Sequence, residues 1–298
     1  MTLFPLSKLT IWTACVALLA GGFLSSSALA QDDPVGDSAR ELLETHKGSL
    51  VVVTIEGRLT TTTDGDPLPD QQQQRRTLGV SIRPTGLIVI SNAAVDPSVG
   101  LTGQKARLGE KVVTIQTAKT VFEKVEISYG DSTVLPGTVI GQDVDADVAF
   151  VLPDQAVAQR LGKTFEHVDL GNAALSKAAD NVVGLSRSSA AYGYMPTVIV
   201  GRVTGVFNGD RRYFVTTAGT AQGIPIFAMD GTVVGITLER IIDDKRSNIL
   251  GTLAAGSIQI LADLALEKHS KGSSGTGGDE AAEPAPAPPE GGSEESGN

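Results

Sequence analysis

The sequence predicts an all-β protein built from two halves, with a short helix near each end of the β-rich region. Short segments rich in valine, isoleucine and leucine recur along the chain and are separated by glycine, proline and aspartate, which is typical of a β-barrel or a β-sandwich. A more polar stretch at residues 156–172 divides these segments into two series. Aromatic residues make up only 4% of the chain, so the core must consist mainly of aliphatic side chains.

Composition divides the chain into five segments. Residues 1–30 lead into a helical stretch at residues 31–47, and two β-rich halves follow at residues 48–155 and 156–269. Residues 270–298 contain glycine, serine, proline and acidic residues but no large apolar side chain. Because burial in such a segment cannot offset the entropy lost on ordering its backbone, we expect a disordered acidic tail.

The first half starts with an amphipathic helix pattern at residues 37–47 and a strand at residues 49–58. A polar loop is expected at residues 60–76, and residues 77–92 form a strand pair that turns at residues 84–86, Pro-Thr-Gly. The remaining strands of this half are expected at residues 112–117, 124–130, 137–143 and 148–154.

The second half repeats this β pattern and ends in a helix. Asp230 and Gly231 separate two apolar runs, which is a strong signal for a tight hairpin. Residues 256–269 have helical periodicity, and Ser257 is the expected N-cap. Strands are expected at residues 181–187, 196–208, 211–217, 223–229 and 232–240.

Residues 1–30 have the pattern of a cleavable export signal. Lys8 precedes an apolar run at residues 9–24, and Ala-Leu-Ala leads up to Gln31. An uncleaved membrane anchor is the alternative, but the run is short for a span of about 20 residues. A lipid-attached Cys15 is rejected because it follows Lys8 too closely. We expect an exported protein, periplasmic or extracellular.

Charge and cysteine content exclude several classes of partner and chemistry. Cys15 is the only cysteine and would leave with the signal, so no disulfide or thiol chemistry is expected in the exported chain. The formal net charge of −10 argues against nucleic acid and anionic membrane surfaces as partners. The arginine pairs at residues 75–76 and 211–212 are interpreted as solvated loop charges.

Four stretches, in their order along the chain, resemble the protease domain of bacterial HtrA-type, trypsin-like serine proteases. Residues 77–96 are similar to the strand pair that leads to the catalytic histidine, and residues 139–152 to the segment that presents the aspartate. Residues 181–208 are similar to the opening strands of the second barrel, and residues 216–236 to the nucleophile loop and its hairpin. The resemblance covers residues 48–266 and implies two six-stranded β-barrels.

The resemblance also implies a degenerate catalytic triad. The family's first strand pair ends in an Asn-Asn-His-type turn, whereas this chain reads SNAAVD and has Ala94 at the histidine position. The family's Gly-Asn-Ser-Gly-Gly-Pro loop corresponds to TAQGIP, which places Gln222 at the serine position. Asp147 is retained at the aspartate position. A serine nucleophile and a histidine base are both required by this chemistry, and neither is present here.

The rest of the nucleophile loop is expected to be altered as well. Thr220 and Gln222 occupy the oxyanion-hole positions, where Thr220 replaces a glycine whose backbone conformation a β-branched residue resists. Gly223 and Ile224 are candidates for lining a binding groove next to the former catalytic site.

Relocated catalysis is the main chemical alternative. His46 lies in the N-terminal helix pattern, His167 in the linker and His269 at the edge of the tail, so each is expected to be a surface or packing residue. No other serine lies in a tight glycine-flanked turn, and the serines at positions 186, 188 and 189 belong to an expected loop.

Metal and cofactor sites are not expected. Asp143, Asp145, Asp147 and Asp154 imitate the spacing of a calcium loop, but Val148 and Asp154 stand where an EF-hand needs glycine and a long acid. There is no His/Cys cluster for zinc and no phosphate-binding or dinucleotide fingerprint.

The sequence therefore favours an exported, catalytically inactive relative of HtrA-type proteases that binds protein or peptide partners in the cell envelope. An active serine endopeptidase with a rearranged site is the first alternative, and a purely structural envelope protein is the second. The oligomeric state is left open.

Overall fold

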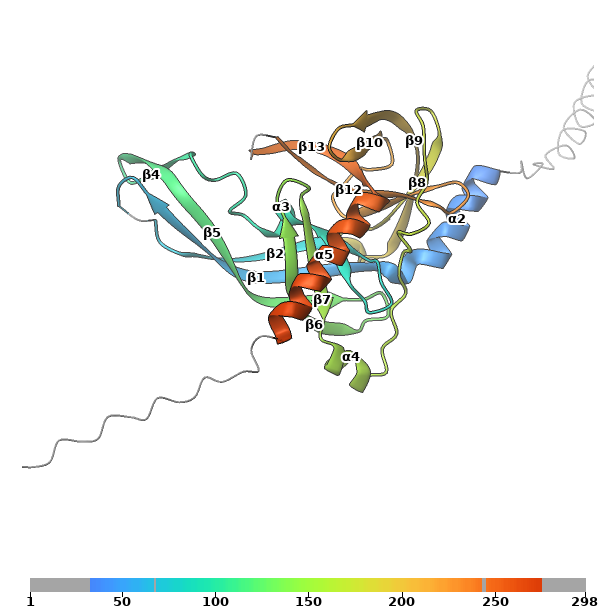
Figure 1. Ribbon diagram of the computed structural model, residues 1–298, viewed down its shortest axis with the longest axis horizontal. Coiled ribbons are helices and arrows are strands. Elements are labelled where there is room, and N and C mark those ends of the chain that lie inside the picture. The colour runs from blue at the N-terminus through green and yellow to red at the C-terminus, as the bar shows by residue number, and fades with distance from the viewer. Residues whose placement is uncertain (1–32, 67, 243–244, 275–298) are drawn as a thin grey trace, which may run out of the picture.

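The computed structural model describes residues 33–66, 68–242 and 245–274 (Figure 1). The predicted export signal lies outside the described residues, as does the expected tail beyond residue 274. Within the described residues the chain forms two antiparallel β-barrels with a few short helices, which confirms the predicted fold class.

The first barrel is closed by a pairing between its first and fifth strands. Its strands are β1 (Leu50–Thr63), β2 (Gln71–Ser81), β3 (Ile88–Ser91), β4 (Lys105–Leu108), β5 (Lys111–Ser128), β6 (Val134–Asp143) and β7 (Val148–Pro153). The order around the sheet is β1-β2-β3-β7-β6-β5, and β4 continues it beyond β5. Because β1 also pairs with β5, six of these strands close on themselves.

The second barrel is closed in the order β10-β13-β12-β11-β8-β9. These strands are β8 (Asn181–Arg187), β9 (Pro196–Asn208), β10 (Arg212–Thr216), β11 (Ile224–Ala228), β12 (Val233–Ile242) and β13 (Lys245–Ala254). The predicted hairpin at Asp230 is confirmed, because Gly231 has a φ of 85° and its N–H donates to the Ala228 carbonyl at 3.1 Å. The turn at residues 84–86 is confirmed in the same way, by a bond from the Gly86 N–H to the Arg83 carbonyl at 2.8 Å.

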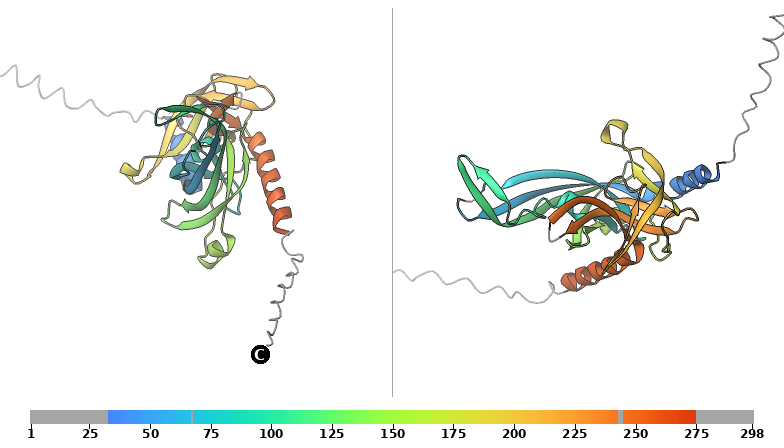
Figure 2. Two further views of the ribbon diagram at one scale, coloured as in Figure 1. Left: turned by 90° about the vertical axis from the view of Figure 1, so that its left-hand side faces the viewer. Right: turned by 90° about the horizontal axis from the view of Figure 1, so that it is seen from above.

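The terminal helices fasten the two barrels together. The helices are α2 (Pro34–His46), α3 (Asn92–Val95), α4 (Gln155–Arg160) and α5 (Ala255–Ser274), with 3₁₀ turns at η1 (Lys47–Ser49) and η2 (Ala190–Tyr192). Helix α2 precedes the first barrel but packs on β8 and β9 of the second, and α5 follows the second barrel but packs on β6 as well as β12 (Figure 2). The described helices include none with the length and apolar character needed to cross a membrane.

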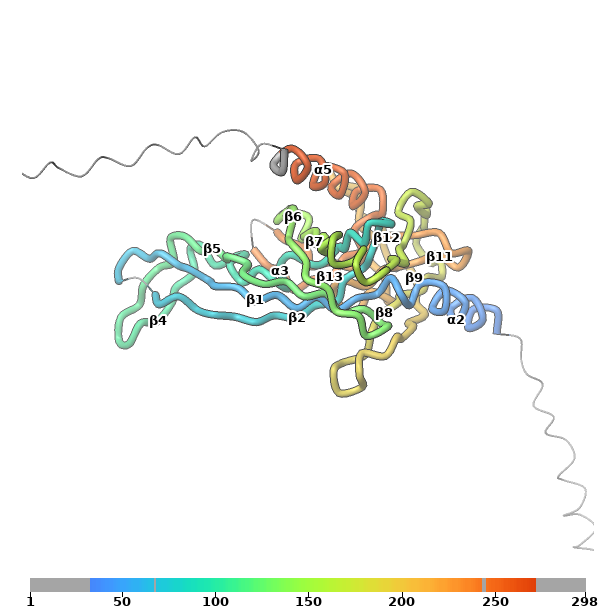
Figure 3. The backbone as a smooth tube through the Cα atoms, turned by 90° about the horizontal axis from the view of Figure 1, so that it is seen from below, coloured from blue at the N-terminus to red at the C-terminus, as the bar shows by residue number. Residues whose placement is uncertain are grey.

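The prediction of a polar loop at residues 60–76 is wrong at both ends of the loop. Strand β1 continues to Thr63 and β2 starts at Gln71, and both belong to an arm that also contains β4 and the first part of β5. Figure 3 shows this arm projecting away from the second barrel. In the arm, β1 does alternate between buried and exposed positions, but threonine fills many of them and glutamine fills the start of β2, so the apolar alternation that identifies a strand in sequence is missing.

Three further boundaries differ from the prediction. The strands expected at residues 112–117 and 124–130 are one continuous strand, β5. Helix α5 already begins at Ala255, directly after β13, so Ser257 lies in its first turn and is not the N-cap. The same helix extends to Ser274, into the segment expected to be tail. Strands β4 and β13 were not predicted.

Candidate functional site

Asp147 lies at the turn between β6 and β7 and is fully buried between the two barrels. Its Oδ1 accepts a hydrogen bond from the Ala93 N–H at 2.6 Å, and its Oδ2 accepts from the Ser91 hydroxyl at 2.7 Å. A third donor, the Glu239 N–H, reaches Oδ2 from β12 at 2.7 Å. Because Ser91 and Ala93 belong to the first barrel and Glu239 to the second, this carboxyl joins the barrels.

The environment of Asp147 raises its pKa to about 6. Burial is the largest cause, because it disfavours the charged carboxylate. The hydrogen bonds from Ala93, Ser91 and Glu239 lower the pKa, and the nearby negative charge of Glu239 raises it slightly further. The outcome is a carboxyl that titrates in the mildly acidic range.

This raised pKa predicts a pH-dependent stability. The folded protein binds the Asp147 proton more tightly than the unfolded chain, whose reference pKa is 3.8, so this contribution is fully present below pH 3.8. It declines as the pH rises and is lost above the folded pKa of about 6. Relative to Asp147→Asn, the wild-type protein should lose about 3 kcal/mol of unfolding free energy between pH values below 3.8 and pH 7, and most of this loss should fall between the unfolded pKa of 3.8 and the folded pKa of about 6.

Urea unfolding of both proteins at a series of pH values from 4 to 7 tests this expectation. Subtracting the asparagine variant removes the titration of every other group. A difference that stays constant across the series would show that Asp147 does not titrate in this range.

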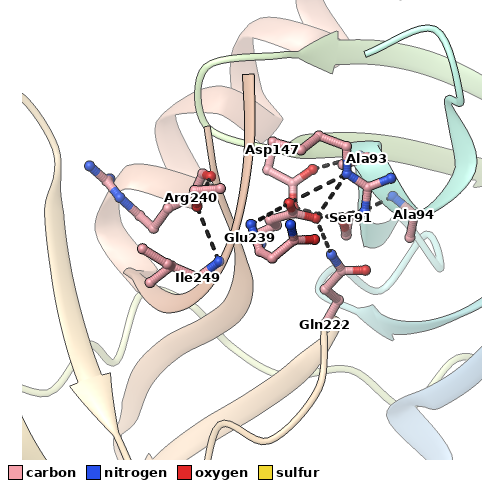
Figure 4. Close-up of polar contacts among 11 residues, drawn as sticks. Ser91, Ala93, Ala94, Asp147, Gln222, Glu239, Arg240 and Ile249 are labelled. Carbon is pink, nitrogen blue, oxygen red and sulfur yellow. Dashed lines mark hydrogen bonds and ion pairs between the residues drawn. The ribbon is translucent and has the colours of Figure 1, made fainter. Parts of the chain in front are cut away.

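Ala94 and Gln222 lie near the carboxyl groups of Asp147 and Glu239 (Figure 4). Ala94 is partly exposed in α3, and its N–H donates to the Ser91 hydroxyl at 3.2 Å. The Gln222 side chain donates from Nε2 to Oε2 of Glu239 at 2.9 Å. The structure therefore brings the three predicted triad positions into one region, although they are far apart in the sequence.

Glu239 is the central residue of this region that the sequence analysis missed. It is only 3% exposed, and its carboxylate accepts from Arg246 at 2.7 Å and from the Asn248 N–H at 3.0 Å, in addition to Gln222. Burial is the strongest single influence and raises the pKa of Glu239, but the bonds from Arg246, Asn248 and Gln222 outweigh it, so the net pKa is lowered. The sequence did contain a signal for this residue, because Glu239 is an acid that directly follows the apolar run of β12.

The loop before β11 uses its backbone groups internally. The Thr220 N–H donates to Ala218 at 3.1 Å, and the Gly223 N–H donates to Thr237 at 2.8 Å. Gly223 has a φ of 79°, and a Cβ there would lie 2.4 Å from the Leu78 carbonyl oxygen of β2, so this close approach requires glycine. Thr220 is not among the non-glycine residues with a positive φ.

The structure does not place Ile224 on an open groove. Its side chain is 1% exposed and packs in the core of the second barrel, because the residue is the first of β11 and points inward. Gly223 is also buried, against Leu78.

The three histidines lie outside this region and contact other groups. The His46 ring stacks on Phe227 with 4.7 Å between ring centroids, and burial, the main cause, lowers its pKa. The His167 ring lies 3.5 Å from the Phe165 carbonyl, and His269 is exposed on α5. The hydroxyls of Ser186 and Ser188 contact backbone carbonyls at 3.4 Å rather than a histidine ring.

The acidic residues that imitate a calcium loop have other partners. Asp143 forms a bidentate pair with Arg211, with distances of 2.7 and 3.1 Å. Asp154 caps α4 through bonds from two backbone N–H groups. In the part of the chain that the structure describes, no group of three or more His, Cys, Asp or Glu residues is placed to hold a metal ion.

A cleft of about 610 Å³ lies beside the last residues of β12. Strand β12 pairs with β11 only as far as Thr237, and residues 238–242 have β13 alone as a partner strand. On the β11 side of this segment Leu238 and Glu239 are buried and the Glu239 N–H donates to Asp147, so the open part of the edge is residues 240–242. The cleft that adjoins it is lined by Phe207, Tyr213, Arg240 and Ile241, together with Asp145, Gly209, Asp210 and Arg211.

A scan of protein-family models finds no match to this chain, and a search of curated proteins finds none either. The two closed six-stranded barrels fit a chymotrypsin-like fold. Because one fold supports many functions, any functional conclusion must come from the site itself.

Proposed function

We propose that this protein is an exported, catalytically inactive relative of HtrA-type trypsin-like proteases that binds extended protein or peptide segments in the cell envelope. One observation carries the proposal. Gln222, which the resemblance aligns with the nucleophilic serine, is hydrogen-bonded to the buried carboxylate of Glu239 between the two barrels. A side chain held in this way fills the place of the attacking group.

The chemistry of the three aligned positions supports the loss of activity. The carboxamide of Gln222 is not a nucleophile at neutral pH, and the methyl group of Ala94 cannot accept a proton. Asp147 accepts hydrogen bonds from the chain itself, so it acts as a structural acceptor between the barrels. In serine proteases, loss of the nucleophile or the base lowers kcat by about 10⁶-fold.

The edge of β12 supports a binding role. An extended peptide can add a strand to a free sheet edge, because its main chain then supplies the missing hydrogen-bond partners. Residues 240–242 provide such an edge, and the adjoining cleft offers space for side chains of the added strand. This arrangement needs no catalytic group, so binding can persist where catalysis has been lost. Location in the cell envelope rests on the leader pattern of residues 1–30.

We expect no proteolysis by the exported protein. Casein and a fluorogenic peptide library should be cleaved no faster than in buffer, and an active-site-directed fluorophosphonate should not label the chain. Turnover that disappears in Asp147→Asn would instead establish the endopeptidase alternative.

The binding half of the proposal has its own test. The immobilised protein should retain an unfolded substrate such as carboxymethylated lactalbumin, and it should not retain the native form. Equal retention of both forms would count against recognition of extended segments.

A further inference from the structure

Arg240 lies at the edge of β12 and is held there by contacts with a glycine and two aromatic rings. Its aliphatic stem packs over Gly251 of β13, where a Cβ would lie 3.3 Å from the arginine Cδ. Its guanidinium lies 3.8 Å from the ring centroid of Tyr213 and 5.4 Å from that of Phe207. Among the described residues, no ion pair or side-chain hydrogen bond satisfies its N–H groups. Figure 4 shows Arg240 pointing away from Glu239.

The neighbouring arginines differ from Arg240 in this respect. Arg246 is bound to Glu239 at 2.7 Å, and Arg211 is bound to Asp143 through both of its terminal nitrogens. Arg240 is partly buried and is oriented by two aromatic rings, which fix the plane of its guanidinium while its N–H donors stay available. A planar guanidinium with free donors matches a carboxylate in a bidentate arrangement.

The cleft also contains two acids, which favour a cation. Asp145 and Asp210 line it, but both are exposed and therefore hydrated. The aromatic rings already displace part of the water around the Arg240 guanidinium. Pairing with an anion therefore costs less desolvation at Arg240 than pairing with a cation costs at a hydrated aspartate. Phe207, which is 54% exposed, provides an apolar wall for the stem of an incoming side chain.

We propose that this cleft binds a carboxylate of the captured segment through Arg240, so that the protein selects acidic peptides. The proposal rests on the proposed function. A residue directly opposite Arg240 in an added antiparallel strand points to the same face, about 5 Å away between Cβ atoms. A glutamate or aspartate at that position reaches the guanidinium, as does a terminal carboxylate at the end of a shorter segment.

A positional-scanning decapeptide library tests the selection. One position at a time is fixed as Glu, Gln or Lys in an otherwise random, C-terminally amidated background, and a second set carries a free C-terminus. Binding to the full chain is measured by retention and mass spectrometry. At one position Glu should be retained about 10-fold more than Gln, since a hydrogen bond between two charged groups is stronger than one to a neutral amide. A preference only in the free-acid set would identify a terminal carboxylate as the ligand.

Two variants assign the selection to Arg240. Arg240→Gln should abolish the preference, and Arg202→Gln, which removes the same charge from an exposed site on β9, should leave it intact. Retention without any preference for acid, or a preference for Lys, would overturn this inference but leave the proposed function standing. If the wild-type chain retains no peptide of any composition, the proposed function itself fails.

Discussion

Asp147→Ala is expected to destabilise the folded protein by about 4 kcal/mol at pH 7, which makes it one of the two most damaging changes in this region. The substitution leaves the Ala93 and Glu239 N–H groups and the Ser91 hydroxyl without an acceptor inside the protein. It also puts alanine at a φ of 57°, which aspartate tolerates better. Removing the buried charge offsets part of this loss, because that charge is itself poorly solvated.

The urea midpoint of unfolding measures the effect. Asp145→Ala serves as the control, because Asp145 is exposed two residues away and should change stability by no more than about 0.5 kcal/mol. Asp147→Asn retains an acceptor at Oδ1 and should fall between the two. Wild-type stability in Asp147→Ala would mean that this carboxyl does not join the barrels.

The sequence predicts most of the fold because most strands are locally encoded. Apolar runs such as residues 181–187 and 148–153 form central strands in which buried side chains dominate. The hairpin at Gly231 is equally local, since the turn is fixed by two adjacent residues. These segments can be predicted without knowing which strands they pair with.

The features that could not be predicted depend on partners distant in sequence. The threonine- and glutamine-rich strands of the arm have no continuous apolar face, so only the pairing of β1 with β2 and with β5 identifies them as strands. The two barrels bring Asp147 to the Glu239 N–H across 92 positions of the chain. The burial of Glu239 likewise depends on Arg246, which an isolated pattern in β12 does not reveal.

Glu239→Met is the second change with a large expected effect, a loss of about 3 kcal/mol in the free energy of unfolding. Methionine fills a similar volume but offers no acceptor to Arg246, the Asn248 N–H or Gln222. Since the Arg246 side chain is 36% exposed, its guanidinium can partly rehydrate, which keeps the loss below that of a fully buried pair.

A double-mutant cycle with Arg246→Met separates the ion pair from simple packing. If the pair accounts for the loss, the double variant should be more stable than the sum of the single losses predicts, by about 1 kcal/mol or more. Strictly additive losses would contradict this. Glu267→Met, which removes an acid from an exposed pair with Lys271, should cost no more than about 0.5 kcal/mol.

The part of the structure that Glu239→Met destabilises also matters for the proposed function. Glu239 binds Asn248 and Arg246 of β13 and Gln222 of the loop before β11, so it fixes both sides of the segment that provides the free edge. Amide hydrogen exchange in Glu239→Met should therefore accelerate in residues 238–242 and 245–250 more than in the first barrel. The edge would then lose the order that strand addition requires, and peptide retention should fall even at temperatures where both barrels remain folded. A variant with unchanged exchange in β12 and undiminished retention would show that the binding edge is held by the barrel alone, and that the Gln222–Glu239–Arg246 network serves only to occupy the former catalytic position.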